Sequence, residues 1–148
     1  MEFKTEAQRN TYDTVVKFAK ELFGEANLRF PDESPVIILD YPGTSTLVFI
    51  SIYPWRDDSS VIEARGLVTR GTELAPDLLL YLLKENIDFR FGGFAVDGDG
   101  DIWFLHSIVG PTCDKEELKA TVSAVVATAD KFDDEIVARW GGRRLVDH

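Results

Sequence analysis

The chain has 148 residues, of which 45% are apolar, and a formal net charge of −10. This length fits one domain, residues 1–148, with its own core, and the apolar content excludes a disordered protein. The acidic balance also argues against nucleic-acid binding, because phosphate backbones are repelled and the one basic pair, Arg143-Arg144, is too small a patch.

The first predicted element is a helix from about Glu6 to Phe23. Thr5 and Gln8 have the spacing of a capping box, and Gly24 suits the position after a helix. Apolar residues recur at helical spacing along one stripe, and the opposite side is charged. We therefore expect a surface helix laid on a core.

Three strands are predicted next, at Val36–Asp40, Thr46–Tyr53 and Val61–Thr69, with a weaker piece at Leu28–Phe30 before them. The runs are rich in β-branched and aromatic residues and are bounded by Pro and Gly. Connections this short favour an antiparallel meander over parallel crossovers.

The second of these strands is apolar on both faces. Leu47, Phe49 and Tyr53 point one way, whereas Val48, Ile50 and Ile52 point the other. A sheet covered on one side alternates apolar with polar residues. Something must therefore cover the second face: another helix, a second subunit or a partner chain.

A second helix is predicted over Thr72–Asn86, with Pro76 at its first position. The six residues from Leu78 to Leu83 are apolar all the way round, so this helix should be buried on more than one side. Either it is a short core helix, or oligomerisation supplies the extra cover. For the second case we name Leu79, Leu82 and Leu83 as candidates for a dimer interface.

The segment from Asn86 to Pro111 is predicted to be a β-hairpin at the centre of the sheet. Its strands are Phe89–Val96 and Ile102–Val109, joined by the turn Asp97–Asp101, which is dense in residues that tolerate tight turns. A bulge or a close backbone approach is the expected reason for Gly92-Gly93 inside the first strand.

A last helix is predicted from Asp114 to Trp140, with Glu117 at capping-box spacing and Gly141-Gly142 at its end. We expect residues 143–148 to form a loose tail. The order is α-β-β-β-α-β-β-α, which indicates an α+β fold with a single antiparallel sheet and helices packed on it.

No catalytic, cofactor or metal site is predicted. The carboxylates of Asp97–Asp101 suggest calcium, but Ile102 and Ile108 occupy the positions where an EF-hand loop needs Gly and a carboxylate. His106 has Ser107 on the opposite face of its strand, so a half-buried structural His is favoured over a base. Cys113 precedes a helix but has no identifiable base.

Aromatic residues supply candidates for partner binding. Trp55 follows Pro54 among charged and small residues, so we expect it to be exposed beside the two-sided apolar sheet. We therefore name Tyr53, Trp55 and Trp103 as residues that contact an unidentified protein partner.

The composition also bears on location. The charged N-terminus has no apolar segment of a signal peptide, and a run of six apolar residues is far short of the roughly 20 that a membrane span needs. The single cysteine, Cys113, excludes an intramolecular disulfide framework and fits a reducing compartment. We expect a cytoplasmic protein without membrane contact.

The element order resembles the type III secretion chaperone-like fold. The runs LLLYLLKEN, FRFGGFAVDGDGDIWFLHSIVG and ADKFDDEIVARWGG look like the YbjN-type and related cyanobacterial domains of that fold. The resemblance covers nearly the whole chain. It implies a small acidic dimer that binds protein segments on apolar patches, with residues Leu78 through Leu83 in the dimer.

The leading hypothesis is a non-enzymatic, dimeric protein-binding module with a chaperone-like or regulatory role. The competing hypothesis is a small-molecule-binding protein or an enzyme that uses His106 and the Asp97–Asp101 turn. A pocket that joins those groups would favour the second hypothesis.

Overall fold

In the computed structural model, which describes residues 1–44 and 46–147, the predicted caps begin the two long helices. Helix α1 spans Glu6–Phe23, and Thr5 Oγ1 accepts a hydrogen bond from the Gln8 N–H. Helix α3 spans Lys115–Trp140, and Asp114 Oδ1 accepts one from the Glu117 N–H. Each helix ends at a glycine with positive φ. Local sequence chemistry therefore sets both ends of both helices.

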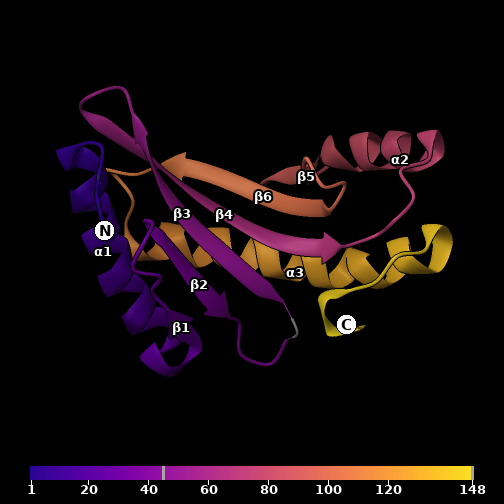
Figure 1. Cartoon of the computed structure of the whole chain (residues 1–148), viewed down its shortest axis with the longest axis horizontal. Helices are drawn as coiled ribbons and strands as arrows, with labels where there is room; N and C mark the ends of the chain where they lie inside the picture. The colour runs from indigo at the N-terminus through magenta and orange to yellow at the C-terminus, as the bar shows by residue number, and fades with distance from the viewer. Residues whose placement is uncertain (45, 148) are drawn as a thin grey trace.

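The strands form one six-stranded antiparallel sheet in the order β1-β2-β3-β4-β6-β5 (Figure 1). The bounds are β1 Leu28–Arg29, β2 Val36–Asp40, β3 Leu47–Trp55, β4 Ser59–Thr69, β5 Gly93–Val96 and β6 Ile102–Val109. Short 3₁₀ turns lie at Glu25–Asn27 and Leu145–Asp147. The α+β fold and the predicted meander of β2, β3 and β4 are confirmed.

We predicted that the hairpin of β5 and β6 lies at the centre of the sheet, and this prediction is wrong. The central strands are β3 and β4, and β5 is an edge strand of four residues. The predicted first strand is too long because the chain bends before Gly93. Gly92 has φ +85°, and a Cβ there would lie 2.5 Å from the Leu105 carbonyl oxygen, so the close backbone approach predicted at Gly92 is present.

Strand β3 runs two residues further than predicted, through Pro54 to Trp55. The last β2 pair joins Ser51 to Val36, so Pro54 lies where β3 has no neighbour on that side. A proline is tolerated on such an edge because its missing N–H removes no ladder hydrogen bond.

Helices α1 and α3 cover the same face of the sheet (Figure 1). The covered face carries buried core residues of β3, β4 and β6, among them Ile50, Ile62 and Phe104. Helix α3 crosses β4 closely at Gly66, where an added Cβ would lie 3.2 Å from a Val125 methyl carbon. The opposite face, which we call the open face, has neither of these helices on it.

Helix α2, Pro76–Asn86, begins four residues later than predicted and lies along the outer edge of β5. The Asn86 side chain accepts a hydrogen bond from the Phe94 N–H at 2.7 Å and donates one to the Phe94 carbonyl at 3.4 Å. The amide therefore occupies the backbone groups to which another strand would bind.

The C-terminal tail was expected to be loose, but the described part of it is anchored. The backbones of Arg143 and Arg70 exchange two hydrogen bonds of 2.9 Å, and the Arg144 guanidinium pairs with Asp134 and Asp147. The side-chain partners lie on α3 and on the tail itself, where sequence spacing alone does not place them. His148 lies outside the described residues.

An aromatic cluster joins α3 to the edge of the sheet. Phe132 is 5% exposed, and its ring lies 5.2 Å from that of Phe94 and 5.7 Å from that of Phe89, in edge-to-face geometry. Such pairs contribute beyond the area that they bury.

Phe132→Ala should lower the free energy of unfolding by about 3–5 kcal/mol, because it opens a cavity within this cluster. Urea denaturation followed by circular dichroism measures the loss. Lys119→Ala, on the exposed side of the same helix, is the control and should change stability little. A loss below about 1 kcal/mol for Phe132→Ala would contradict its core role.

Asp133 lies beside this cluster on α3 and is 8% exposed. Burial raises the pKa of its carboxyl to about 6, and the hydrogen bond from the Asp134 N–H offsets this only in part, since the negative charges of Asp134 and Asp130 also raise the pKa. The folded state therefore favours the protonated acid. Its contribution to stability is full below the unfolded pKa of about 3.9 and is lost as the pH rises through about 6.

Asp133→Asn should accordingly stabilise the protein by about 1–3 kcal/mol at pH 7.5 and have little effect at pH 4. Urea titrations at the two pH values measure the difference, with the exposed Asp88→Asn as control. A stabilisation of equal size at both pH values would show that the ionisation of Asp133 is not its cause.

Candidate protein-binding surface

The open face carries the three residues that we named for partner binding. Register alone places Tyr53, Trp55 and Trp103 on it, because they alternate with residues buried under α1 and α3. Trp55 is the last residue of β3 rather than part of a loop, and it is 56% exposed. Its predicted exposure is therefore present.

The three residues fall into two groups. Tyr53 pairs with Val61 of β4, whereas Trp103 pairs with Leu67, six residues further along β4. At about 3.4 Å per residue the two groups lie roughly 20 Å apart. We call them the Trp55 patch and the Trp103 patch; the first consists of Tyr53, Trp55, Val61 and Val109, and the second of Phe49, Leu67, Trp103 and Leu105.

Val109 at the Trp55 patch is 58% exposed and Tyr53 is 44% exposed, so this end of the open face is the wetter one. In the Trp103 patch the rings of Phe49 and Trp103 meet edge to face at 5.8 Å.

We did not name Val109 or Leu105 as surface candidates from the sequence. Their alternation with the buried positions of β6 is the signal that could have placed them on the same face.

An ion pair lies on the open face between Tyr53 and Trp103. Arg65 Nε donates to Glu63 Oε1 at 2.6 Å, and the guanidinium lies 5.5 Å from the Trp103 ring. The spacing of two residues on β4 places both side chains on the open face. The surface is therefore apolar at both ends and charged in the middle.

The Asp97–Asp101 turn holds Trp103 in place through a side-chain hydrogen bond. Asp97 Oδ2 accepts a 2.8 Å hydrogen bond from Trp103 Nε1, and Oδ1 accepts from the Asp99 and Asp101 N–H groups. These bonds, the one to Trp103 above all, hold the pKa of the Asp97 carboxyl below its usual value. Asp101 is buried and pairs with Arg70.

His106 lies on the covered face, opposite Ala64, and is half-buried as expected. Burial lowers the pKa of its imidazole, and its ring meets that of Phe91 edge to face at 5.6 Å. The hollow that His106 lines is completed by Phe91, Ile108 and residues of α3, with no residue of the Asp97–Asp101 turn. The groups of the competing enzyme hypothesis are thus not brought together there.

Cys113 is buried, and its thiol donates to the Asp114 carbonyl oxygen at 3.3 Å. Burial, with help from Glu117 and Asp114, raises the pKa of the thiol to about 11. A thiol with a raised pKa is a poor nucleophile at neutral pH. Cys113 therefore acts as a small core residue.

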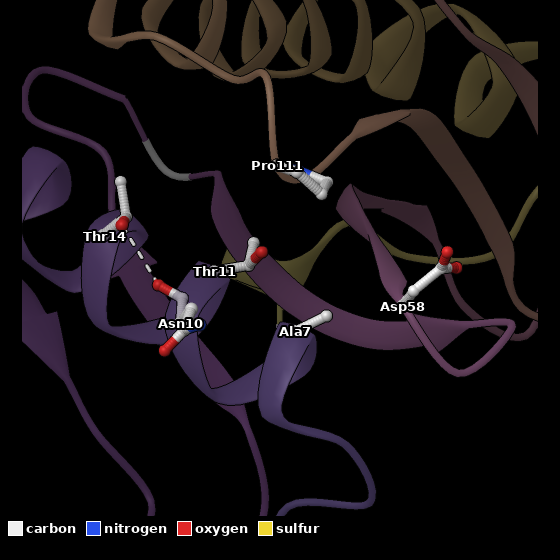
Figure 2. A pocket seen from close by; sticks show the side chains of 7 residues that line it. Ala7, Asn10, Thr11, Thr14, Asp58 and Pro111 are labelled. Atoms are coloured by element: carbon white, nitrogen blue, oxygen red, sulfur yellow. Dashed lines mark hydrogen bonds between the residues drawn. The ribbon is translucent and has the colours of Figure 1, made fainter.

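A second hollow, of about 260 Å³, lies between α1 and the end of β6. Figure 2 shows Ala7, Asn10, Thr11 and Thr14 from α1, with Asp58 and Pro111 opposite. Its two hydroxyl groups are already bonded: Thr14 Oγ1 donates to the Asn10 carbonyl, and the Thr11 hydroxyl lies 2.6 Å from that of Ser60. This hollow offers no set of converging reactive groups.

The predicted interface residues of α2 divide between core and surface. Leu82 is 4% exposed and packs into its own domain, whereas Leu83 is 67% exposed and Leu79 is 37% exposed. With Phe94, Ala95 and Val96 of β5, these leucines line an apolar groove of about 260 Å³. Helix α2 is thus apolar on all sides but buried on one side only, whereas we had expected burial on more than one side.

Membrane and metal sites can also be considered over the described residues. No helix formed by residues 1–44 and 46–147 is long and apolar enough to cross a bilayer. Within the same residues, no group of three or more His, Cys, Asp or Glu side chains is arranged to hold a metal ion.

The fold matches several solved structures. A chain of the HopA1–SchA chaperone–effector complex matches with a TM-score of 0.64 and 16% identity, covering 85% of this chain and 96% of that one. A chain of the ExsC–ExsE complex matches with a TM-score of 0.63 and 15% identity, covering 87% and 95%. YbjN from E. coli, titled a putative transcription regulator, matches with a TM-score of 0.55 and 11% identity, covering 84% and 92%.

These likenesses define the fold as that of the type III secretion chaperones and YbjN. The chain itself belongs to the TY-Chap1 family, described as T3SS (YopN, CesT) and YbjN peptide-binding chaperone 1, which matches residues 11–148. The predicted resemblance is confirmed. No curated protein matches the chain.

Proposed function

We propose that this protein is a non-enzymatic chaperone or regulator that binds extended segments of partner proteins on its open face. The observation that carries the proposal is the pair of apolar patches on a sheet face that α1 and α3 leave uncovered. Contiguous apolar surface on a folded protein marks a binding site more often than chance placement does.

The spacing of the patches suggests the form of the partner. A segment that reaches from Tyr53 to Trp103 must span roughly 20 Å, which is about six residues of extended chain. The Glu63–Arg65 pair between these two residues can bond polar groups of such a segment. We place this activity in the cytoplasm, where the unpaired thiol of Cys113 would remain reduced.

An array of 15-residue peptides with varied aliphatic and aromatic content tests the proposal. The wild type should bind a subset rich in apolar residues, and Tyr53→Ser with Trp55→Ser should weaken that binding by roughly tenfold or more, because aromatic anchors dominate such surfaces. Ile87→Ser, which removes an exposed apolar side chain after α2, is the matched control. A wild type that binds no peptide would show the function to be wrong.

We further propose that the protein acts as a homodimer through α2. Leu79, Leu80 and Leu83 expose apolar surface beside the groove along β5. A twofold interface would bury the same patch on both copies. Because we place the partner segment on the open face, we expect a second copy of the chain to bind elsewhere, and α2 offers such a surface.

Leu83→Glu should convert the dimer to a monomer without unfolding it, because an unpaired charge is costly inside an interface but not on a free surface. Sedimentation equilibrium measures the mass, and circular dichroism the fold. Lys84→Glu, at the adjacent exposed position, should leave the dimer intact. A wild type that is monomeric at tens of micromolar would contradict the dimer.

A further inference from the structure

The end of β6 has a free edge on the side where β5 lies. The register of β5 against β6 ends with Gly93 opposite Leu105, although β6 continues to Val109. Within residues 1–44 and 46–147, nothing pairs with the outer side of His106–Val109. Asn86 occupies the backbone of β5 at its own outer edge, but it does not reach this stretch.

The direction of the free backbone groups follows from the register. The Gly110 N–H donates to the Ser60 carbonyl on the β4 side. Residues of an antiparallel strand alternate in the side to which their N–H and C=O groups point. Ser107 and Val109 therefore direct both groups to the free edge, where a strand of another chain can bind them.

A groove runs beside this free edge on the covered face. Its volume is about 510 Å³, roughly twice that of the hollows beside α1 and α2. His106 and Ile108 form its wall on the sheet, Phe91 closes one end, and Ala120 and Thr121 of α3 lie opposite. A strand added to β6 would direct every second side chain into this groove.

The rim of the groove is acidic. Asp114, Glu116 and Glu117 line it at the start of α3. Lys115 is paired with Glu21, and among the described ion pairs none includes Glu116 or Glu117. Burial favours the neutral form of His106, so this residue adds little positive charge.

From this geometry we infer a second binding site, for an extended segment that pairs with the β6 edge at Ser107 and Val109 and directs an apolar and a basic side chain into the groove. The inference rests on the proposed peptide-binding function and names a separate surface for it. The strand hydrogen bonds supply affinity, and the groove with Glu116 and Glu117 selects the sequence.

Charge distinguishes this occupant from a second copy of the chain. Two copies paired edge to edge here would bring Glu116 and Glu117 of one toward those of the other, on molecules that each carry a formal charge of −10. Like charges at an interface oppose association. A basic segment is attracted by the same groups.

The probes are labelled decapeptides in which Thr alternates with residues that would face the groove. The groove-facing residues are Leu and Val, except that one of them is Lys, Gln or Glu, which gives three versions of the peptide. Fluorescence anisotropy measures binding. The Lys peptides should bind best, with the preference over Glu peptides decreasing as salt rises. In two further versions the backbone nitrogens are methylated at the Thr positions or at the groove-facing positions. For a peptide antiparallel to β6, methylation at the Thr positions should abolish binding, because the Thr residues lie opposite Ser107 and Val109 and their N–H groups point to β6, whereas methylation at the other positions should not.

Variants of the protein test the same site from the other side. Ser107→Pro removes an outward N–H at an edge where proline is tolerated, and it should weaken peptide binding by roughly tenfold. Ser107→Thr is the matched control, and thermal melting reports folding. Glu116→Gln with Glu117→Gln should remove the preference for Lys over Gln, whereas Glu73→Gln, away from the groove, should not. If Ser107→Pro unfolds, the methylated peptides on the wild type still decide.

Binding that ignores both methylation patterns, or no saturable binding across the panel, overturns the edge site. So does a wild-type dimer that Ser107→Pro converts to a monomer, because a second copy would then be the occupant. Equal binding of Lys and Glu peptides overturns the basic preference. If the wild type binds peptides of the 15-residue array through Trp55 but does not bind these decapeptides, only the edge site is wrong. If it binds no peptide of the array but binds the decapeptides in a way that methylation abolishes, the open-face function is wrong.

Discussion

The packing of α3 across one face of the sheet is the contact on which the rest of the structure depends. The contact is tight at Gly66, where an added Cβ would lie 3.2 Å from a Val125 methyl carbon. Together with α1, this contact buries the side chains of one face of β3, β4 and β6. These helices leave the other face of the same strands uncovered. The side chains on that face are therefore not needed to fill the core beneath α1 and α3.

The edges of the sheet are treated unequally. The backbone of β5 is occupied by the Asn86 amide and flanked by α2, which limits uncontrolled strand pairing. Among residues 1–44 and 46–147, nothing pairs with the outer side of the end of β6, which lies beside a groove with an acidic rim. Protection at one edge and access at another are what a protein that captures extended segments needs in order to avoid self-assembly.

Three sequence features that could suggest a reactive site, the acidic turn, Cys113 and His106, make contacts within the fold. The acidic turn orients Trp103 through Asp97, and Cys113 is a buried thiol with a raised pKa. His106 packs against Phe91 on the covered face. Their side chains are bonded or packed internally, which leaves the exposed apolar residues as the chemically distinctive part of the surface.

The sequence by itself determined the elements with local signals. Thr5 and Asp114 begin their helices as predicted because capping depends on residues three positions away, and the alternation of β3 identified a two-sided strand. Only the tertiary structure decided which face the helices cover, that the hairpin lies at the edge, that Leu82 is core while Leu83 is exposed, and that β6 outruns β5. Those outcomes depend on contacts between residues far apart in the chain, such as Gly66 with Val125, and no local pattern encodes such contacts.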